Sequence, residues 1–157
     1  MTTEVRRATS GDLDVLVALQ REVHGLHVAS RPDFFKPADD EAVAAWFRGL
    51  LESADTQIWV AVEAGVVVGN AVAMQQQRSE SIFSGTHTRC EVDQIVVTRD
   101  HRRKGIARAL LKAVVDHAHS QGIHEIELSS WSFNADAHAA FERLGFVPKL
   151  IRFELKG

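Results

Sequence analysis

One stretch of the chain, residues 91–107, constrains the fold more than any other. An apolar segment with two carboxylates, EVDQIVV, runs into a basic turn, a glycine and then an amphipathic helix. Backbone N–H groups at the start of a helix have no partner within the helix, and the helix dipole adds partial positive charge there. Such a turn binds phosphate, and Arg102, Arg103 and Lys104 favour a polyanion. The sequence therefore predicts a pyrophosphate-binding turn ahead of a helix.

The turn lacks the glycine spacing of the two common nucleotide-binding loops. Neither Gly-x-Gly-x-x-Gly nor Gly-x-x-x-x-Gly-Lys-Ser/Thr is present. The turn instead reads Arg102-x-x-Gly105-x-Ala107, which resembles the Gln/Arg-x-x-Gly-x-Gly/Ala loop of the GCN5-related N-acetyltransferase (GNAT) superfamily. In that family the loop binds the pyrophosphate of acetyl-CoA. A helix start with solvated basic residues is the alternative interpretation of these six residues alone.

A second motif follows at the spacing that the resemblance requires. Val97 ends the expected strand eight residues before Gly105, and the helix after Gly105 repeats its apolar residues every 3.6 positions until Gly122. Residues 123–128 alternate as a strand does. The segment that begins at Asn134, NADAHAAFERLGF, resembles the family's closing Asn-x-x-Ala-x-x-x-Tyr-x-x-x-Gly-Phe. Two spaced motifs in this order identify the chain as a member of the superfamily.

Length and composition agree with a single α+β domain over residues 1–157. A chain of this length forms one core, and 45% hydrophobic with 25% charged residues is typical of a soluble globular protein. The resemblance implies a GNAT-like domain, a mixed, mostly antiparallel central sheet flanked by helices, in the order β-α-α-β-β-β-α-β-α-β. In that fold the strands ending at Val97 and Ser130 are parallel and splay apart, and the cofactor enters the gap.

Apolar periodicity and turn residues place the other elements. A two-residue hairpin turn is expected at Ala64 and Gly65, and residues 24–37 are expected to be an irregular connection. We expect strands at 5–9, 57–63, 66–76 and 89–98, a first helix carrying Leu13 to Leu19, a second helix at 39–51 and a polar loop at 78–88.

Charge, cysteine content and hydropathy exclude several classes of protein. A net charge of −3 argues against binding to nucleic acid or to an anionic membrane. No apolar run approaches the ~20 residues of a membrane span, and the start lacks an apolar signal core, so we expect a cytoplasmic protein. The single cysteine, Cys90, excludes an internal disulfide. His117 and His119 point in different directions on one helix, so no metal site is expected.

The resemblance implies direct transfer of an acetyl group from acetyl-CoA to an amine in a ternary complex. Such a site needs a route for the amine's proton and a donor for the oxyanion. Alternation along the strand puts Glu91, Asp93, Ile95 and Val97 on one face. Glu91 and Asp93 occupy positions where family members carry a base. Either carboxylate as the base and a pair that binds the cationic amine both remain open. A solvated strand face and an ion pair with Arg89 or Arg99 remain open as well.

The resemblance also implies which residues meet the cofactor. The N–H of Val97 or its neighbour is the expected oxyanion donor, and Asn134 contacts the cofactor, caps a helix, or does both. Many family members have a tyrosine acid where this chain has Phe141, and the chain contains no tyrosine. His138 is a candidate replacement, alongside water or unassisted departure of the thiolate. The full predicted set is Ile95, Val96, Val97, Arg102, Arg103, Lys104, Gly105, Ile106, Ala107, Arg108, Asn134 and Phe141.

The acceptor site is the least defined part of the sequence. The resemblance places it at the first two helices, their connection and the loop 78–88, which include His24, His27, Arg31, Asp33, Phe34 and Phe35. The acceptor is expected to be an amine-bearing small molecule or a protein amine, and the resemblance allows a homodimer. Because the tyrosine acid is missing, an acyl-CoA-binding module with impaired catalysis is the second function.

Overall fold

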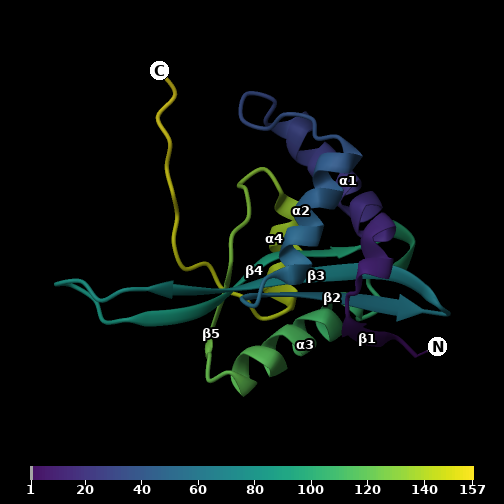
Figure 1. The fold of residues 1–157 in the computed structure, drawn as a ribbon. Helices are drawn as coiled ribbons and strands as arrows, with labels where there is room; N and C mark the ends of the chain where they lie inside the picture. Colours follow the sequence, from purple (N-terminus) through teal and green to yellow (C-terminus); the bar gives the residue numbers. More distant parts are fainter. Residues whose placement is uncertain (1) are drawn as a thin grey trace.

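The computed structural model describes residues 2–157, in which one five-stranded sheet carries helices on both faces (Figure 1). The elements are β1 (Glu4–Arg7), α1 (Leu13–Ser30), α2 (Asp40–Glu52), β2 (Thr56–Glu63), β3 (Val66–Arg78), β4 (His87–Val97), α3 (Ile106–Ser120), β5 (Glu125–Leu128) and α4 (Ala135–Arg143). Short 3₁₀ turns precede α1 and follow β4. Within the described part of the chain, no helix is long and apolar enough to cross a membrane.

The strands lie in the order β1-β2-β3-β4-β5 and are antiparallel except for the parallel pair of β4 and β5. This is the mixed, mostly antiparallel sheet that the sequence predicts. The turn between β2 and β3 is formed by Ala64 and Gly65, with φ angles of 50° and 77°. Two positive φ angles are characteristic of a tight hairpin turn, which confirms the predicted hairpin.

A separate apolar cluster covers each face of the sheet. Leu16 of α1 and Phe47 of α2 pack on one face, whereas Leu110 and Val114 of α3 pack on the other. All four side chains are at most 1% exposed. In Figure 1, α1 and α2 lie above the sheet and α3 lies below it. The strands pack against apolar side chains on both faces, so packing supports the end of β4 from both sides.

The predicted irregular connection at residues 24–37 is wrong in its first half, because α1 continues to Ser30. Gly25 interrupts the apolar pattern there, but a glycine in a helix costs only about 1 kcal/mol. The Nδ1 of His27 donates to the carbonyl oxygen of Val23 at 2.9 Å within this extended part. The first helix therefore reaches further toward the acceptor end than its sequence pattern indicates.

The predicted last strand is absent from the described residues, so the sheet has five strands rather than six. After α4 the chain runs to residue 157 without a strand and leaves the sheet beside β5 (Figure 1). Lys149 forms an ion pair with Glu127 of β5, and Glu154 lies 3.1 Å from Arg31 at the end of α1. The segment therefore contacts β5 through the side chain of Lys149 and then reaches the end of α1.

Candidate active site

The parallel strands β4 and β5 separate at a β-bulge. Their pairing ends with Val92 opposite Leu128. On the other side of β4 the register with β3 shifts after Val92, which leaves Asp93 as an extra residue without a partner. Such a bulge bends its strand and redirects side chains. The gap that the sequence predicts between these strands therefore opens at Asp93.

The bulge corrects the predicted arrangement of the carboxylates. Simple alternation placed Glu91, Asp93, Ile95 and Val97 on one face, and this is wrong because one residue is inserted. Ile95 and Val97 pack against the cluster beneath α3. Glu91 lies opposite Met74, which packs with the cluster of α1 and α2. Odd-numbered residues of β4 therefore face α1 and α2 before the bulge and face α3 after it.

Asp93 has the properties of a proton acceptor. The pKa of its carboxyl is raised, first because surrounding protein atoms displace water and second because the Glu91 carboxylate is near. The residue nevertheless remains exposed to solvent. A raised pKa brings a carboxylate closer to the proton affinity that general base catalysis needs near neutral pH.

The sequence left open an ion pair between a carboxylate and an arginine, and the structure shows that Glu91 pairs with Arg89. Its Oε2 lies 3.7 Å from Nη2 of Arg89, and the Nε of Arg89 lies 3.5 Å from Glu127. The same Nη2 donates to Oε1 of Gln76 at 2.9 Å. Because Arg89 is shared among these groups, Glu91 is held in place as a negative charge beside Asp93.

The basic turn meets α3 at a glycine that its backbone requires. Gly105 has a φ of 83°, in the left-handed region, and a Cβ built there meets no atom within 4 Å. The space in front of it is therefore open. The first N–H groups of α3, beginning at Ile106, have no partner within the helix. Open space beside unpaired donors fits a phosphate group.

The basic side chains near this turn have different partners. The Nε of Arg102 donates to the carbonyl oxygen of Val97 at 3.1 Å, which ties the turn to the end of β4. Arg108 donates from Nη2 to a carbonyl at the C-terminal end of α4 at 3.0 Å. Across residues 2–157, no hydrogen bond or ion pair involves the exposed side chains of Arg103 and Lys104. Those two are the cations available for a phosphate.

Three residues of α4 or its N-cap were predicted to contact the cofactor or to act as the acid, and each contacts other groups of the protein. The Oδ1 of Asn134 accepts from a backbone N–H of the first turn at 3.3 Å, so this residue caps the helix. His138 donates from Nε2 to the carbonyl oxygen of Trp131 at 2.9 Å, which joins α4 to the loop after β5. Phe141 packs edge-to-face on Phe146, with ring centroids 6.2 Å apart. Their contacts with a cofactor remain predictions.

An aromatic cluster joins the end of α1 to the loop after β5. The ring centroids of Phe34 and Phe35 lie 5.1 and 5.2 Å from that of Trp131, and Arg31 lies 5.2 Å from the same ring. The cluster consists of His27, Phe34, Phe35, Trp131 and Phe133. Phe133 is not among the residues predicted from the sequence, although it follows closely after the predicted strand at residues 123–128.

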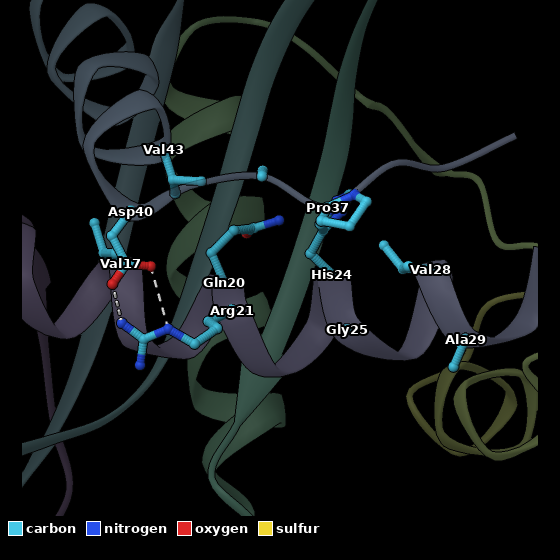
Figure 2. Close-up of a pocket in the computed structure, with 11 residues that line it drawn as sticks. Val17, Gln20, Arg21, His24, Gly25, Val28, Ala29, Pro37, Asp40 and Val43 are labelled. Atoms are coloured by element: carbon cyan, nitrogen blue, oxygen red, sulfur yellow. Dashed lines mark hydrogen bonds and ion pairs between the residues drawn. The ribbon is translucent and has the colours of Figure 1, made fainter. Parts of the chain in front are cut away.

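A cavity of roughly 310 Å³ lies between α1 and the chain that enters α2 (Figure 2). Arg21 pairs with Asp40 at one end, with Nε donating to Oδ1 at 3.2 Å. His24, also in its wall, donates from Nε2 to the carbonyl oxygen of Lys36 at 2.7 Å. Since no wall residue belongs to β4 or β5, this cavity is separate from the gap at Asp93.

Comparison with known proteins identifies related sequences. Residues 22–146 match the acetyltransferase (GNAT) family. The streptothricin acetyltransferase of Streptomyces lavendulae is 32% identical over 96 residues, 61% of this chain and 47% of that protein, so the chain spans about half its length. An L-methionine sulfoximine/L-methionine sulfone acetyltransferase of Pseudomonas paraeruginosa is 29% identical over 147 residues, 93% of this chain and 81% of that protein.

Comparison with solved structures extends the likeness over the whole chain. The aminoglycoside N-acetyltransferase AAC(6')-Iy, in complex with CoA, has a TM-score of 0.80 and 19% sequence identity. The match covers 99% of this chain and 95% of that one. At this level of identity the likeness shows a shared fold.

Proposed function

The chain belongs to the acetyltransferase (GNAT) family, and from this membership we propose that it acetylates a small amine with Asp93 as the proton acceptor. The family match confirms the predicted superfamily, and the solved structures confirm the α+β fold. N-acetyl transfer with acetyl-CoA as co-substrate is what this membership supports. The cytoplasm stays the proposed compartment.

The turn before α3 supports the placement of the acetyl-CoA pyrophosphate. The open space at Gly105, the unpaired N–H groups of α3 and the exposed cations Arg103 and Lys104 all favour an anion there. Arg102 donates to the carbonyl oxygen of Val97, so this turn lies beside the end of β4. Bound acetyl-CoA supplies an activated thioester, and the end of β4 orients it beside the gap.

Asp93 carries the proposal, because a carboxyl with a raised pKa lies where β4 and β5 part. When the amine nitrogen bonds to the thioester carbon, the carbon–sulfur bond breaks and the nitrogen loses a proton. Asp93 accepts that proton directly or through one water. Glu91 adds negative charge that attracts a cationic amine. The sulfur leaves as a thiolate, which needs little assistance because a thiol has a pKa near ~8.5.

The acceptor is proposed to be a small amine-bearing molecule rather than a protein. By their names, the two related enzymes act on streptothricin and on methionine sulfoximine or sulfone, which are small molecules. The aromatic cluster and the carboxylates of Glu91 and Asp93 offer flat apolar surface and negative charge, which suit a compact cation. A protein N-terminus or lysine is the competing class.

Thiol release from acetyl-CoA, measured against amino acids, polyamines, aminoglycosides and peptides, tests the proposal. We expect turnover with one class of small amine. Asp93→Asn should lower kcat by about 100-fold or more, with unchanged affinity for acetyl-CoA. Asp100→Asn is the matched control, because Asp100 is an exposed acid in the 3₁₀ turn just beyond β4. Equal kcat values for wild type and Asp93→Asn across pH would contradict the role of Asp93.

A second function, an acyl-CoA-binding module without turnover, is motivated by Phe141 at the position of the tyrosine acid. The raised pKa of Asp93 favours catalysis, because a protein that only binds needs no tuned carboxyl in the gap. Calorimetric binding of acetyl-CoA without thiol release on any amine would favour the module instead.

A further inference from the structure

A fully buried asparagine lies in β3, the central strand of the sheet. Asn70 is 0% exposed, and neither its Oδ1 nor its Nδ2 forms a hydrogen bond with any group of residues 2–157. Buried side-chain amides almost always have a hydrogen-bond partner, because an unpaired polar group in a core destabilises the fold. The protein therefore keeps a costly polar group at the centre of its sheet.

A second buried amide lies beside Asn70 on β4. Asn70 lies opposite Val96. Gln94, two residues before Val96, lies opposite Val72 of β3. Because residues two apart on a strand share a face, Asn70 and Gln94 are diagonal neighbours on the same face of the sheet. The Nε2 of Gln94 is buried and has no hydrogen-bond partner in the described part of the chain.

The face that these two amides share is covered by α1, which adds a third. Val72 packs in one apolar cluster with Leu16 and Val17 of α1. Gln20 lies one helical turn beyond those two residues, so it is on the same side of the helix. The Oε1 of Gln20 is also buried, and no group within residues 2–157 donates to it. Three elements thus bring buried amides to the region between α1 and the sheet.

The chemistry of these groups fits water. An amide offers both a donor and an acceptor, and rotation about its last bond exchanges the two. A water molecule donates to one group and accepts from another, and a buried water typically makes about three hydrogen bonds to polar groups that lack other partners. Because all three amides are uncharged, they favour a neutral ligand over an ion.

The site adjoins the part of β4 that has only one neighbouring strand. β5 pairs with β4 only as far as Val92, so residues 94–97 pair with β3 alone. One face of this stretch packs in the apolar cluster of α3. The opposite face carries Gln94, which directly follows Asp93. Hydrogen bonds to the Gln94 amide therefore restrain the strand beside the proposed proton acceptor.

We propose that Asn70, Gln94 and Gln20 bind ordered water molecules beneath α1, and that Asn70 thereby positions the end of β4 for acetyl transfer. Asn70 touches no reacting group, so it is a positioning residue that acts through water and Gln94. The role in catalysis rests on the proposed function, whereas the water site and its effect on β4 do not.

Nuclear Overhauser effects from water to side-chain amide protons test the site. We expect the NH₂ groups of Asn70 and Gln94 to receive magnetisation from water that stays bound much longer than surface water. Gln77 is the internal control, because it is exposed on the same strand as Asn70 and should contact only short-lived surface water. The absence of a bound-water signal at Asn70 and Gln94 would overturn the proposal.

Two substitutions of Asn70 separate hydrogen bonding from packing. Asn70→Leu keeps the side-chain volume and removes the hydrogen bonds, whereas Asn70→Ser keeps a hydroxyl for water and leaves a cavity. We expect kcat to fall about 10-fold in Asn70→Leu and to recover most of that loss in Asn70→Ser, with an unchanged KM for acetyl-CoA. Gln77→Leu is the matched control, since it removes an exposed amide from β3 and should leave kcat unchanged.

Hydrogen exchange of the backbone amides measures the positioning without relying on activity. Residues 94–97 should exchange faster in Asn70→Leu than in wild type, and as in wild type in Gln77→Leu. Unchanged exchange or an unchanged kcat in Asn70→Leu would overturn the positioning role, and so would a kcat in Asn70→Ser as low as in Asn70→Leu. A wild type that acetylates no amine would contradict the proposed function instead, and the exchange rates and water signals would still test the site.

Discussion

Gly69 of β3 lies so close to Val96 of β4 that a Cβ at position 69 would stand 2.7 Å from the Val96 carbonyl oxygen. The same Cβ would be 3.4 Å from the Cα of Val97. Both are backbone atoms at the end of β4, so no side-chain rotation relieves the contact. Gly69→Ala is therefore expected to displace this strand end and to cost about 1–3 kcal/mol of stability.

The displaced strand end should also reduce catalysis, because a shift of about 1 Å costs about 100-fold in rate. Initial rates and thermal unfolding of Gly69→Ala measure both effects. Gly49→Ala in α2 is the control, since a Cβ there meets no atom within 4 Å. That variant should keep the wild-type rate and gain slightly in stability. A normal rate in Gly69→Ala would show that the end of β4 has no catalytic importance.

Ionisation of Asp93 is expected to destabilise the fold, because the pKa of this carboxyl is raised in the folded state. A raised pKa means that stability present at low pH is lost as pH rises through the folded pKa. Asp93→Asn removes that loss. The variant should therefore unfold at a higher temperature than wild type at neutral pH, and the difference should vanish below about pH 4. Thermal unfolding of wild type and Asp93→Asn, measured between about pH 4 and neutral pH, tests this difference. A lower unfolding temperature of the variant at neutral pH would contradict a carboxyl whose pKa is raised by desolvation.

Asp12 should have the opposite pH dependence. It is 7% exposed and accepts from Nη1 and Nη2 of Arg6 at 2.9 and 3.0 Å, which lowers the pKa of its carboxyl. Its stabilising effect is present at neutral pH and is lost as pH falls through the folded pKa. Because Arg6 is 38% exposed, solvent screens part of the attraction, and Asp12→Asn should cost about 1–2 kcal/mol at neutral pH.

Denaturant unfolding of Asp12→Asn at neutral and acid pH measures this cost. Asp14→Asn in the first turn of α1 is the control, because Asp14 is exposed. That variant should match wild type at both pH values. A cost for Asp12→Asn that persists unchanged in acid would mean that the pair with Arg6 is not its source.

The basic turn and α3 were predictable because their conformations are local. Gly105 and Gly122 flank an apolar period of 3.6, and both adopt the positive φ angles that glycine favours, 83° and 75°. The hairpin at Ala64 and Gly65 was predictable for the same reason. Each of these features depends on a few consecutive residues, so it can be predicted from the sequence alone.

The bulge at Asp93 was not predictable, because it depends on how β4 pairs with two other strands at once. The alternating sequence EVDQIVV gave no sign of an inserted residue. The sequence also left open whether Glu91 forms an ion pair with an arginine, and the structure shows that it pairs with Arg89.

The last strand that the sequence predicts shows the same limit. Ile151, Phe153 and Leu155 alternate with charged residues, but a pattern does not say whether an edge of the sheet is free to pair with them.

Calorimetric titration of acetyl-CoA into two glycine variants tests the central claim most directly. Gly105 and Gly122 lie at opposite ends of α3, both have positive φ, and a Cβ at either meets no atom within 4 Å. Gly105→Val and Gly122→Val should therefore lose similar stability, while only Gly105 faces the phosphate site. We predict that Gly105→Val weakens acetyl-CoA binding by about 100-fold or more and that Gly122→Val binds as wild type does. Wild-type affinity in Gly105→Val would contradict the account.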